Sequence, residues 1–99
     1  MIHVVAIITA KPGLRAQVLE AFHANVPAVH AEDGCIEYGP VIDADFPGAK
    51  FGDDTFVVIE KWQSADHLKA HAASPHMAAY GAKTKEWIAS RTIHVLQSA

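Results

Sequence analysis

The chain has 99 residues, of which 51% are hydrophobic, and its formal net charge is −3 at pH 7, which predicts one domain over residues 1–99. The sequence contains no basic stripe that would bind nucleic acid, and no apolar run reaches the roughly 20 residues of a membrane span. The one cysteine, Cys35, excludes an internal disulfide and is typical of a reducing compartment, so we expect a cytoplasmic protein.

The first third of the chain predicts a strand followed by a helix. Residues 2–9 are almost all apolar, which is typical of a strand buried on both faces, and a turn at Gly13 ends it. Apolar residues then recur every three or four positions over residues 14–29, which indicates an amphipathic helix. Pro27 should kink or divide this helix, which we expect to end at Gly34 in a left-handed conformation.

Two strands and a long loop follow. Residues 35–43 predict the second strand, and Pro40 within it favours an edge position because proline cannot donate to a neighbouring strand. Residues 44–54 form a loop that is long for a hairpin connection, and we expect it to be the most mobile segment and a lid over the site. Residues 55–62 are rich in β-branched and aromatic side chains and predict the third strand.

The last third of the chain predicts two short helices and a strand. Ser64 is suited to cap a helix over residues 65–72, and Pro75 is suited to the first turn of the next helix. We expect the second helix to bury four apolar side chains at three- and four-residue spacing, namely Met77, Tyr80, Trp87 and Ile88. Residues 91–97 predict the final strand.

The predicted order of elements is βαββαβ, which is the α+β, ferredoxin-like arrangement with an antiparallel sheet. In this arrangement the first and third strands are the central pair, and residues 2–9 and 55–62 are indeed the two continuously apolar runs. Helices can cover only one face of such a sheet. We therefore expect a second copy of the chain on the other face, giving a homodimer of the dimeric α/β barrel type.

Histidines are concentrated in one segment. His67 and His71 are four residues apart on one predicted helix, a spacing that allows two imidazoles to share a metal ion. No third ligand is fixed beside them, and His76 lies beyond a helix break, so we expect no metal site. His71 borders the apolar face of its helix, where it is either a proton acceptor or donor or a buried histidine bonded to the backbone.

Glu60 and Trp62 lie where the third predicted strand leaves the core. Glu60 has a perturbed pKa if its face is covered, or else it pairs with a lysine or arginine at the end of the strand. Trp62 is expected to pack at the junction of helix and sheet. Cys35 is more typical of a small core residue than of a nucleophile.

Two segments together resemble a known family. The pattern Glu60-x-Trp62-x-Ser64, followed by Leu68, His71, Ser74 and His76, is similar to the signature of the antibiotic biosynthesis monooxygenase (ABM) family, which includes the quinol monooxygenases. The segment from Asp33 to Tyr38 resembles the entry into the second strand of that family. The agreement in the order of elements extends the resemblance over nearly the whole chain, so that we expect a single ABM-like domain.

The resemblance implies a homodimer whose sheets pack together and which oxidises a polycyclic phenol or quinol with O2 and no cofactor. By position, His71 and Trp62 would line a pocket between sheet and helices, and Glu60 would support it, so these three are the candidate catalytic residues. Haem-degrading relatives have an iron-binding histidine near the place of Tyr80 and an asparagine in the first strand. This chain has neither, so haem degradation is not expected.

Two other classes of function fit the same residues. One is a non-catalytic dimeric protein that binds a small molecule, and the other is an isomerase or lyase in which the same pocket only moves protons. The sequence does not separate these from a monooxygenase, because it fixes no strongly placed catalytic pair.

Overall fold

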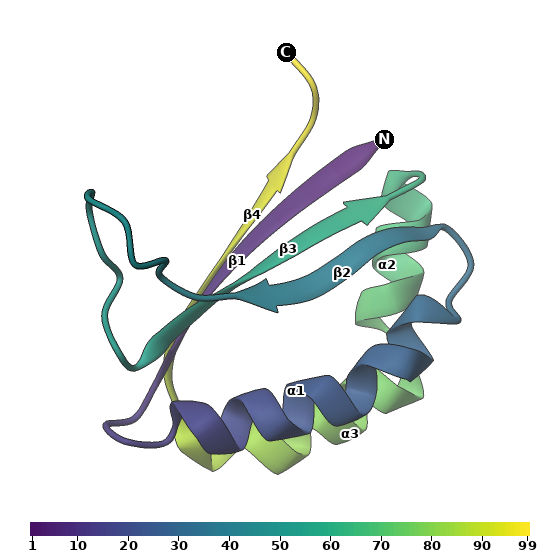
Figure 1. Ribbon diagram of the computed structural model, residues 1–99. Helices are drawn as coiled ribbons and strands as arrows, with labels where there is room; N and C mark the ends of the chain where they lie inside the picture. The colour runs from purple at the N-terminus through teal and green to yellow at the C-terminus, as the bar shows by residue number, and fades with distance from the viewer.

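The computed structural model describes residues 1–99. Strands and helices alternate along the chain in the predicted βαββαβ order, with the second helical segment in pieces (Figure 1). The elements are β1 (Ile2–Ala10), α1 (Arg15–His30), β2 (Cys35–Val41), β3 (Thr55–Trp62), α2 (Ala65–Ala72), α3 (Pro75–Thr84), the short 3-10 helix η1 (Lys85–Trp87) and β4 (Ile88–Leu96). None of these helices combines the length and the apolar character that crossing a membrane requires.

The four strands form one antiparallel sheet in the order β2-β3-β1-β4. The predicted central pair is confirmed, because β1 pairs with β3 over eight residues, from Ile2 opposite Trp62 to Thr9 opposite Thr55. The predicted edge position of β2 is also confirmed. At this edge the absent N–H of Pro40 costs no hydrogen bond to a further strand.

All the helices pack on one face of the sheet (Figure 1). Along β1 the side chains alternate, so that Val4, Ala6 and Ile8 are buried beneath the helices while Val5 and Ile7 are only partly covered. In the single chain β1 is therefore buried on one face only, and burial of its other face by a second copy stays a prediction. The core forms between the helices and the buried face, where the largest fully buried side chains are Trp62, Phe22, Phe56, Val4, Val18, Val29 and Thr84.

Helix α1 runs through Pro27 without being divided, so the expected division of this helix is wrong. Proline removes one N–H donor, but the turn that follows is closed by backbone bonds from Ala31 to the Pro27 carbonyl and from Glu32 to the Val29 carbonyl. Val29 is fully buried, so core packing holds the last turn in place. The helix ends at His30, and Gly34 then takes the left-handed conformation expected of it, at φ 79°.

The chain enters β4 earlier than predicted. The helical spacing that includes Ile88 suggested a longer helix, but α3 ends at Thr84, and Ile88 already lies opposite Ala10 in the sheet. The 3-10 turn at η1 explains the difference, because Trp87 and Ile88 still pack against the core while the backbone has turned to pair with β1. The Trp87 carbonyl also accepts a bond from the Lys11 N–H.

The loop over residues 44–54 projects from the end of the sheet away from α2 (Figure 1). Its base is organised by Asp43, whose carboxylate accepts bonds from the backbone N–H groups of Phe51 and Gly52 at 3.0 and 2.8 Å. These two bonds hold the pKa of Asp43 below its usual range. Mobility of the loop stays a prediction.

Candidate active site

A cavity of about 430 Å³ lies between the buried face of the sheet and helices α2 and α3. Thirteen of its sixteen lining residues are hydrophobic, and the three others are Glu60, His71 and Arg91. An apolar cavity with few polar groups is the usual form of a small-molecule site. None of the lining residues comes from the loop 44–54, so this structure gives no support to the predicted lid.

The three residues predicted to be catalytic lie together beside this cavity. Trp62 is 0% exposed, His71 5% and Glu60 7%. The rings of Trp62 and His71 lie with their centroids 4.5 Å apart. Strand β3 carries Glu60 and Trp62, and α2 brings the side chain of His71 beside them. His71 lines the cavity as expected, but Glu60 lines it in place of Trp62, which was expected there.

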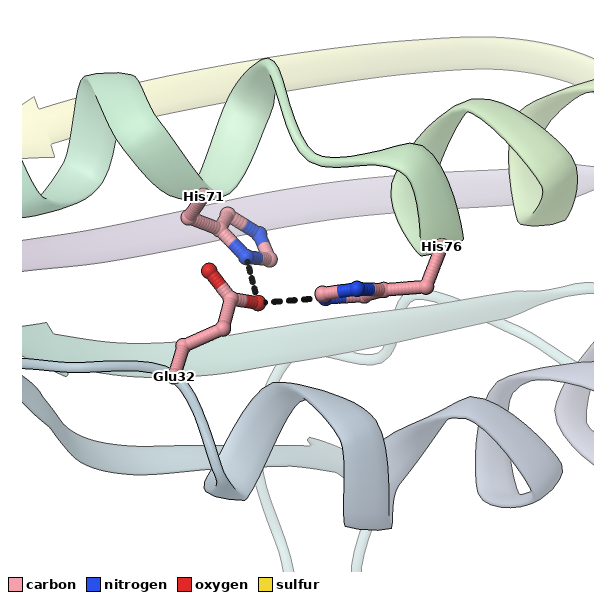
Figure 2. Close-up of side chains that lie close together, drawn as sticks. All are labelled: Glu32, His71 and His76. Atoms are coloured by element: carbon pink, nitrogen blue, oxygen red, sulfur yellow. Dashed lines mark hydrogen bonds and ion pairs between the residues drawn. The ribbon is translucent and has the colours of Figure 1, made fainter.

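His71 is held by a carboxylate from a distant part of the chain. Its Nδ1 lies 2.8 Å from Oε2 of Glu32, in the segment that follows α1 (Figure 2). A carboxylate oxygen accepts, so Nδ1 carries the proton in this bond and Nε2 of the neutral ring is left as the acceptor. Of the two alternatives for His71, a bond from the ring to the backbone is not found.

The same oxygen of Glu32 is also contacted by a second imidazole. His76 Nε2 lies 2.7 Å from Glu32 Oε2, so two histidines from α2 and α3 converge on one carboxylate (Figure 2). Ser74, at the break between the two helices, donates its hydroxyl to the His71 carbonyl at 2.7 Å and lies 3.2 Å from His76 Nε2. The helix break therefore brings His76 back to His71 rather than separating them.

Glu60 has no lysine or arginine partner, contrary to the more ordinary of the two expectations. Its Oε1 accepts a bond of 2.9 Å from the indole Nε1 of Trp62, and His71 Nε2 lies 4.0 Å from the same oxygen. Burial raises the pKa of Glu60, against a smaller lowering effect of the indole bond and the nearby imidazole. A carboxyl group in this state is suited to exchange protons nearer neutral pH than an exposed glutamate.

Tyr38 forms another part of the cavity wall. Its ring stacks on Phe22 with centroids 5.0 Å apart and meets His71 edge-on at 5.4 Å. Burial raises the pKa of the Tyr38 phenol far above its ordinary value of 10. The phenol therefore stays protonated and can donate a hydrogen bond to an oxygen of a bound molecule.

His67 does not join His71, so the pair considered for metal binding is not formed. The His67 ring contacts Ser64 Oγ through Nδ1 at 2.6 Å and Asp33 Oδ2 through Nε2 at 3.3 Å. It packs closely over Gly34, where an added Cβ would lie 2.4 Å from the ring. His67 thus fixes the start of α2 against the turn before β2, away from the cavity.

Sequence reasoning missed Glu32 and did not assign a role to Tyr38. Glu32 lies 39 positions before His71, and no motif spacing connects a residue after one helix with a residue on another. Cys35 is partly buried against the core, and burial raises its pKa. A raised pKa keeps the thiol protonated, which fits the expected packing role.

Comparison with known proteins gives consistent results. Residues 1–83 match the family described as "Antibiotic biosynthesis monooxygenase". The chain is 39% identical over 101 residues to a protein of Escherichia coli K12 named "Probable quinol monooxygenase YgiN", and the match covers 98% of this chain and 97% of that protein.

Solved structures show the same fold. The structure of Rv0793 from Mycobacterium tuberculosis superposes with a TM-score of 0.83 at 26% identity, covering 99% of this chain and 94% of that one. A structure described as a putative antibiotic biosynthesis monooxygenase from Nitrosomonas europaea gives a TM-score of 0.85 at 19% identity, covering 99% and 98% of the two chains. With its sheet order, its cavity and these matches, the chain belongs to the antibiotic biosynthesis monooxygenase family.

Proposed function

We propose that this protein is a cytoplasmic monooxygenase that oxidises a quinol or polycyclic phenol with O2 and without a cofactor. The observation that carries the proposal is the His71 imidazole, oriented by Glu32 at 2.8 Å and exposed to a cavity whose other walls are almost wholly apolar. Such a cavity suits a flat aromatic molecule, and one positioned base suits removal of its hydroxyl proton.

In the proposed reaction, His71 Nε2 accepts the proton of a substrate hydroxyl. Glu32 stabilises the imidazolium that forms, because its carboxylate already accepts from Nδ1. The substrate anion passes one electron to O2, and the resulting radical pair combines into a carbon-bound peroxide. Cleavage of the O–O bond leaves one oxygen atom on the ring and releases the other as water with two hydrogens of the substrate.

The remaining groups of the site would bind the oxygens of the substrate and keep water out of the cavity. The Tyr38 phenol and the buried Glu60 carboxyl are among the other polar groups that line the cavity and could contact substrate oxygens, together with Tyr80 and Arg91. The apolar walls exclude water, which strengthens these hydrogen bonds and stops protons from quenching the anion. Trp62 acts indirectly, because its indole bond fixes Glu60 in place.

We also propose that the working form is a homodimer. Ile93 and Val95 of β4 line the cavity, yet they remain 54% and 56% exposed in the single chain. Val5 and Ile7, on the opposite face of the sheet, are only partly covered. A second copy would remove this apolar surface from water. Sedimentation at micromolar concentration should give twice the monomer mass, and a stable monomer would contradict the proposal.

The test of the chemistry is oxygen consumption with a panel of reduced naphthoquinols and polycyclic phenols. Quinols also react with O2 in the absence of protein, so each rate is compared with that of the His71→Gln variant at the same concentration. Heavy-isotope O2 should place one labelled oxygen atom in the product and the other in water.

The outcomes separate the candidate functions. Oxygen uptake above the variant's background, with one labelled atom retained, supports the monooxygenase. Product formed equally well without O2 would contradict it and indicate an isomerase or lyase. Tight binding of the panel with no product would indicate a binding protein.

A further inference from the structure

We propose that Glu32, His71 and His76 form a binding site for a divalent transition-metal ion, with Zn²⁺ as the expected occupant. Each residue offers one ligand atom, and the three atoms lie within 4.8 Å of one another. They come from three separate segments, namely the turn that follows α1, the last turn of α2 and the first turn of α3 (Figure 2). The inference goes beyond the proposed oxidation, which needs no metal.

The chemistry of the donors selects the class of ion. Two imidazoles and one carboxylate are a ligand set of Zn²⁺ sites, and they also form the facial triad that binds Fe²⁺. Ca²⁺ and Mg²⁺ prefer oxygen ligands, so a site with two nitrogen donors disfavours them.

The distances allow an ion after a modest adjustment. Glu32 Oε2 lies 2.8 Å from His71 Nδ1 and 2.7 Å from His76 Nε2. Neighbouring ligand atoms around a tetrahedral ion with bonds of about 2.1 Å are about 3.4 Å apart. The Glu32 oxygen would therefore move about 0.6 Å away from each ring nitrogen, and the ion would replace the protons that now lie between them.

The charge around the site is favourable. Glu32 has no lysine or arginine partner, and its only ion-pair contacts are the two imidazoles. Its side chain is mostly buried, while that of His76 is more than a quarter exposed, at 28%. A partly buried carboxylate without a fixed cation attracts one, and the exposed side of His76 provides a path from solvent.

Groups beside the ligands are placed to support them. With Nδ1 on the metal, the Nε2–H of His71 would point toward Glu60 Oε1, which lies 4.0 Å away and would have to come about 1 Å closer to accept a hydrogen bond. A carboxylate bonded to a metal-binding histidine is typical of protein metal sites. Ser74 fixes the helix break by its bond to the His71 carbonyl, and its hydroxyl lies beside His76.

Metal binding would have one consequence for turnover, and this part rests on the proposed function. A neutral imidazole that binds metal through Nδ1 carries its hydrogen on Nε2. His71 could then no longer accept a substrate proton, so Zn²⁺ should inhibit the oxidation, and a chelator should restore it.

The binding test uses untagged protein freed of metal by chelator, titrated with Zn²⁺ in a calorimeter, and with Co²⁺ followed by its visible absorption. We expect one ion per chain and Co²⁺ bands of nitrogen and oxygen coordination. Glu32→Gln and His76→Gln should each weaken Zn²⁺ binding by about tenfold or more. The matched control is His67→Gln, which removes a histidine of α2 outside the cluster and should leave the affinity unchanged.

The result that would overturn the site is equal Zn²⁺ affinity in wild type, Glu32→Gln and His76→Gln, or no binding beyond that of an exposed histidine. The three residues would then be a hydrogen-bonded cluster only. Binding with the expected variant pattern but no oxidation of any substrate would keep the metal site and reject the proposed function. If Zn²⁺ binds at this site and the oxidation is not slowed, the inference that the metal blocks His71 is wrong.

Discussion

Nδ1 of His71 lies 2.8 Å from Oε2 of Glu32, although 39 positions separate the two residues in the chain. The bond joins the turn that follows α1 to the last turn of α2, and the strands β2 and β3 lie between these two segments in the sequence. It determines which nitrogen of the neutral imidazole carries the proton. The proposed function and the proposed metal site both depend on it.

Replacing Glu32 by glutamine tests this bond in catalysis. The variant keeps the shape of the side chain but loses the charge that stabilises the His71 imidazolium, so we expect turnover to fall by about 10²-fold with a smaller effect on KM. Nitrogen NMR of the imidazoles should also show less of the Nδ1–H tautomer of His71.

The control is Glu20→Gln, which removes the same charge from an exposed position on α1. It should turn over at the wild-type rate. Equal loss in both variants would mean that net charge, and not the bond to His71, is responsible, and an unchanged NMR tautomer in Glu32→Gln would also contradict the account.

Glu60→Gln should change how stability depends on pH. Because burial raises the pKa of Glu60 in the folded metal-free protein, the folded state binds more protons than the unfolded state above the ordinary glutamate pKa. The contribution of Glu60 to the free energy of unfolding therefore decreases as pH rises from that value through the raised one. Glutamine does not ionise and still accepts from Trp62.

Urea unfolding of wild type and Glu60→Gln across this pH range is the measurement. The variant should become progressively more stable than wild type as pH rises, and the difference should level off once the folded carboxyl is ionised. A difference that is constant with pH, or that changes in the opposite direction, would show that the pKa of Glu60 is not raised.

Gly34→Ala should destabilise the junction between α1 and β2. Gly34 has φ 79°, and an added Cβ would lie 2.4 Å from the His67 ring, so we expect a loss of about 1 to 3 kcal/mol in the free energy of unfolding. Gly39→Ala is the matched control, since its φ is not positive and an added Cβ meets nothing within 4 Å. Equal melting temperatures for the two variants would refute the argument.

The sequence predicted the fold well because its signals are local and repeated. The apolar runs of β1 and β3 identified the central pair, Pro40 identified an edge, and Gly34 a left-handed turn. The prediction that Pro27 divides α1 failed because burial of the last turn of this helix outweighs one lost hydrogen bond. Ile88 was expected in the last helix because it packs against the core at helical spacing. In the structure a 3-10 turn precedes it, so Ile88 already lies in β4 and still contacts the core.

The site was only partly predictable. Glu60, Trp62 and His71 lie close together in sequence, so a motif could indicate them, and the structure places them side by side. Glu32 could not be found in this way, because its bond to His71 exists only once the turn after α1 has been brought against α2. The helix break between His71 and His76 argued against a shared site, but in the structure this break turns His76 toward the same carboxylate of Glu32.

The most direct test of the central claim is oxygen uptake by the His71→Ala variant with the best substrate of the panel, measured together with its melting temperature. If His71 is the base, turnover should fall by roughly 10²- to 10⁴-fold in a protein that remains folded at the assay temperature. A variant that melts earlier, by the equivalent of about 1 to 3 kcal/mol, yet consumes oxygen at the wild-type rate would show that His71 only packs and that the chemistry lies elsewhere.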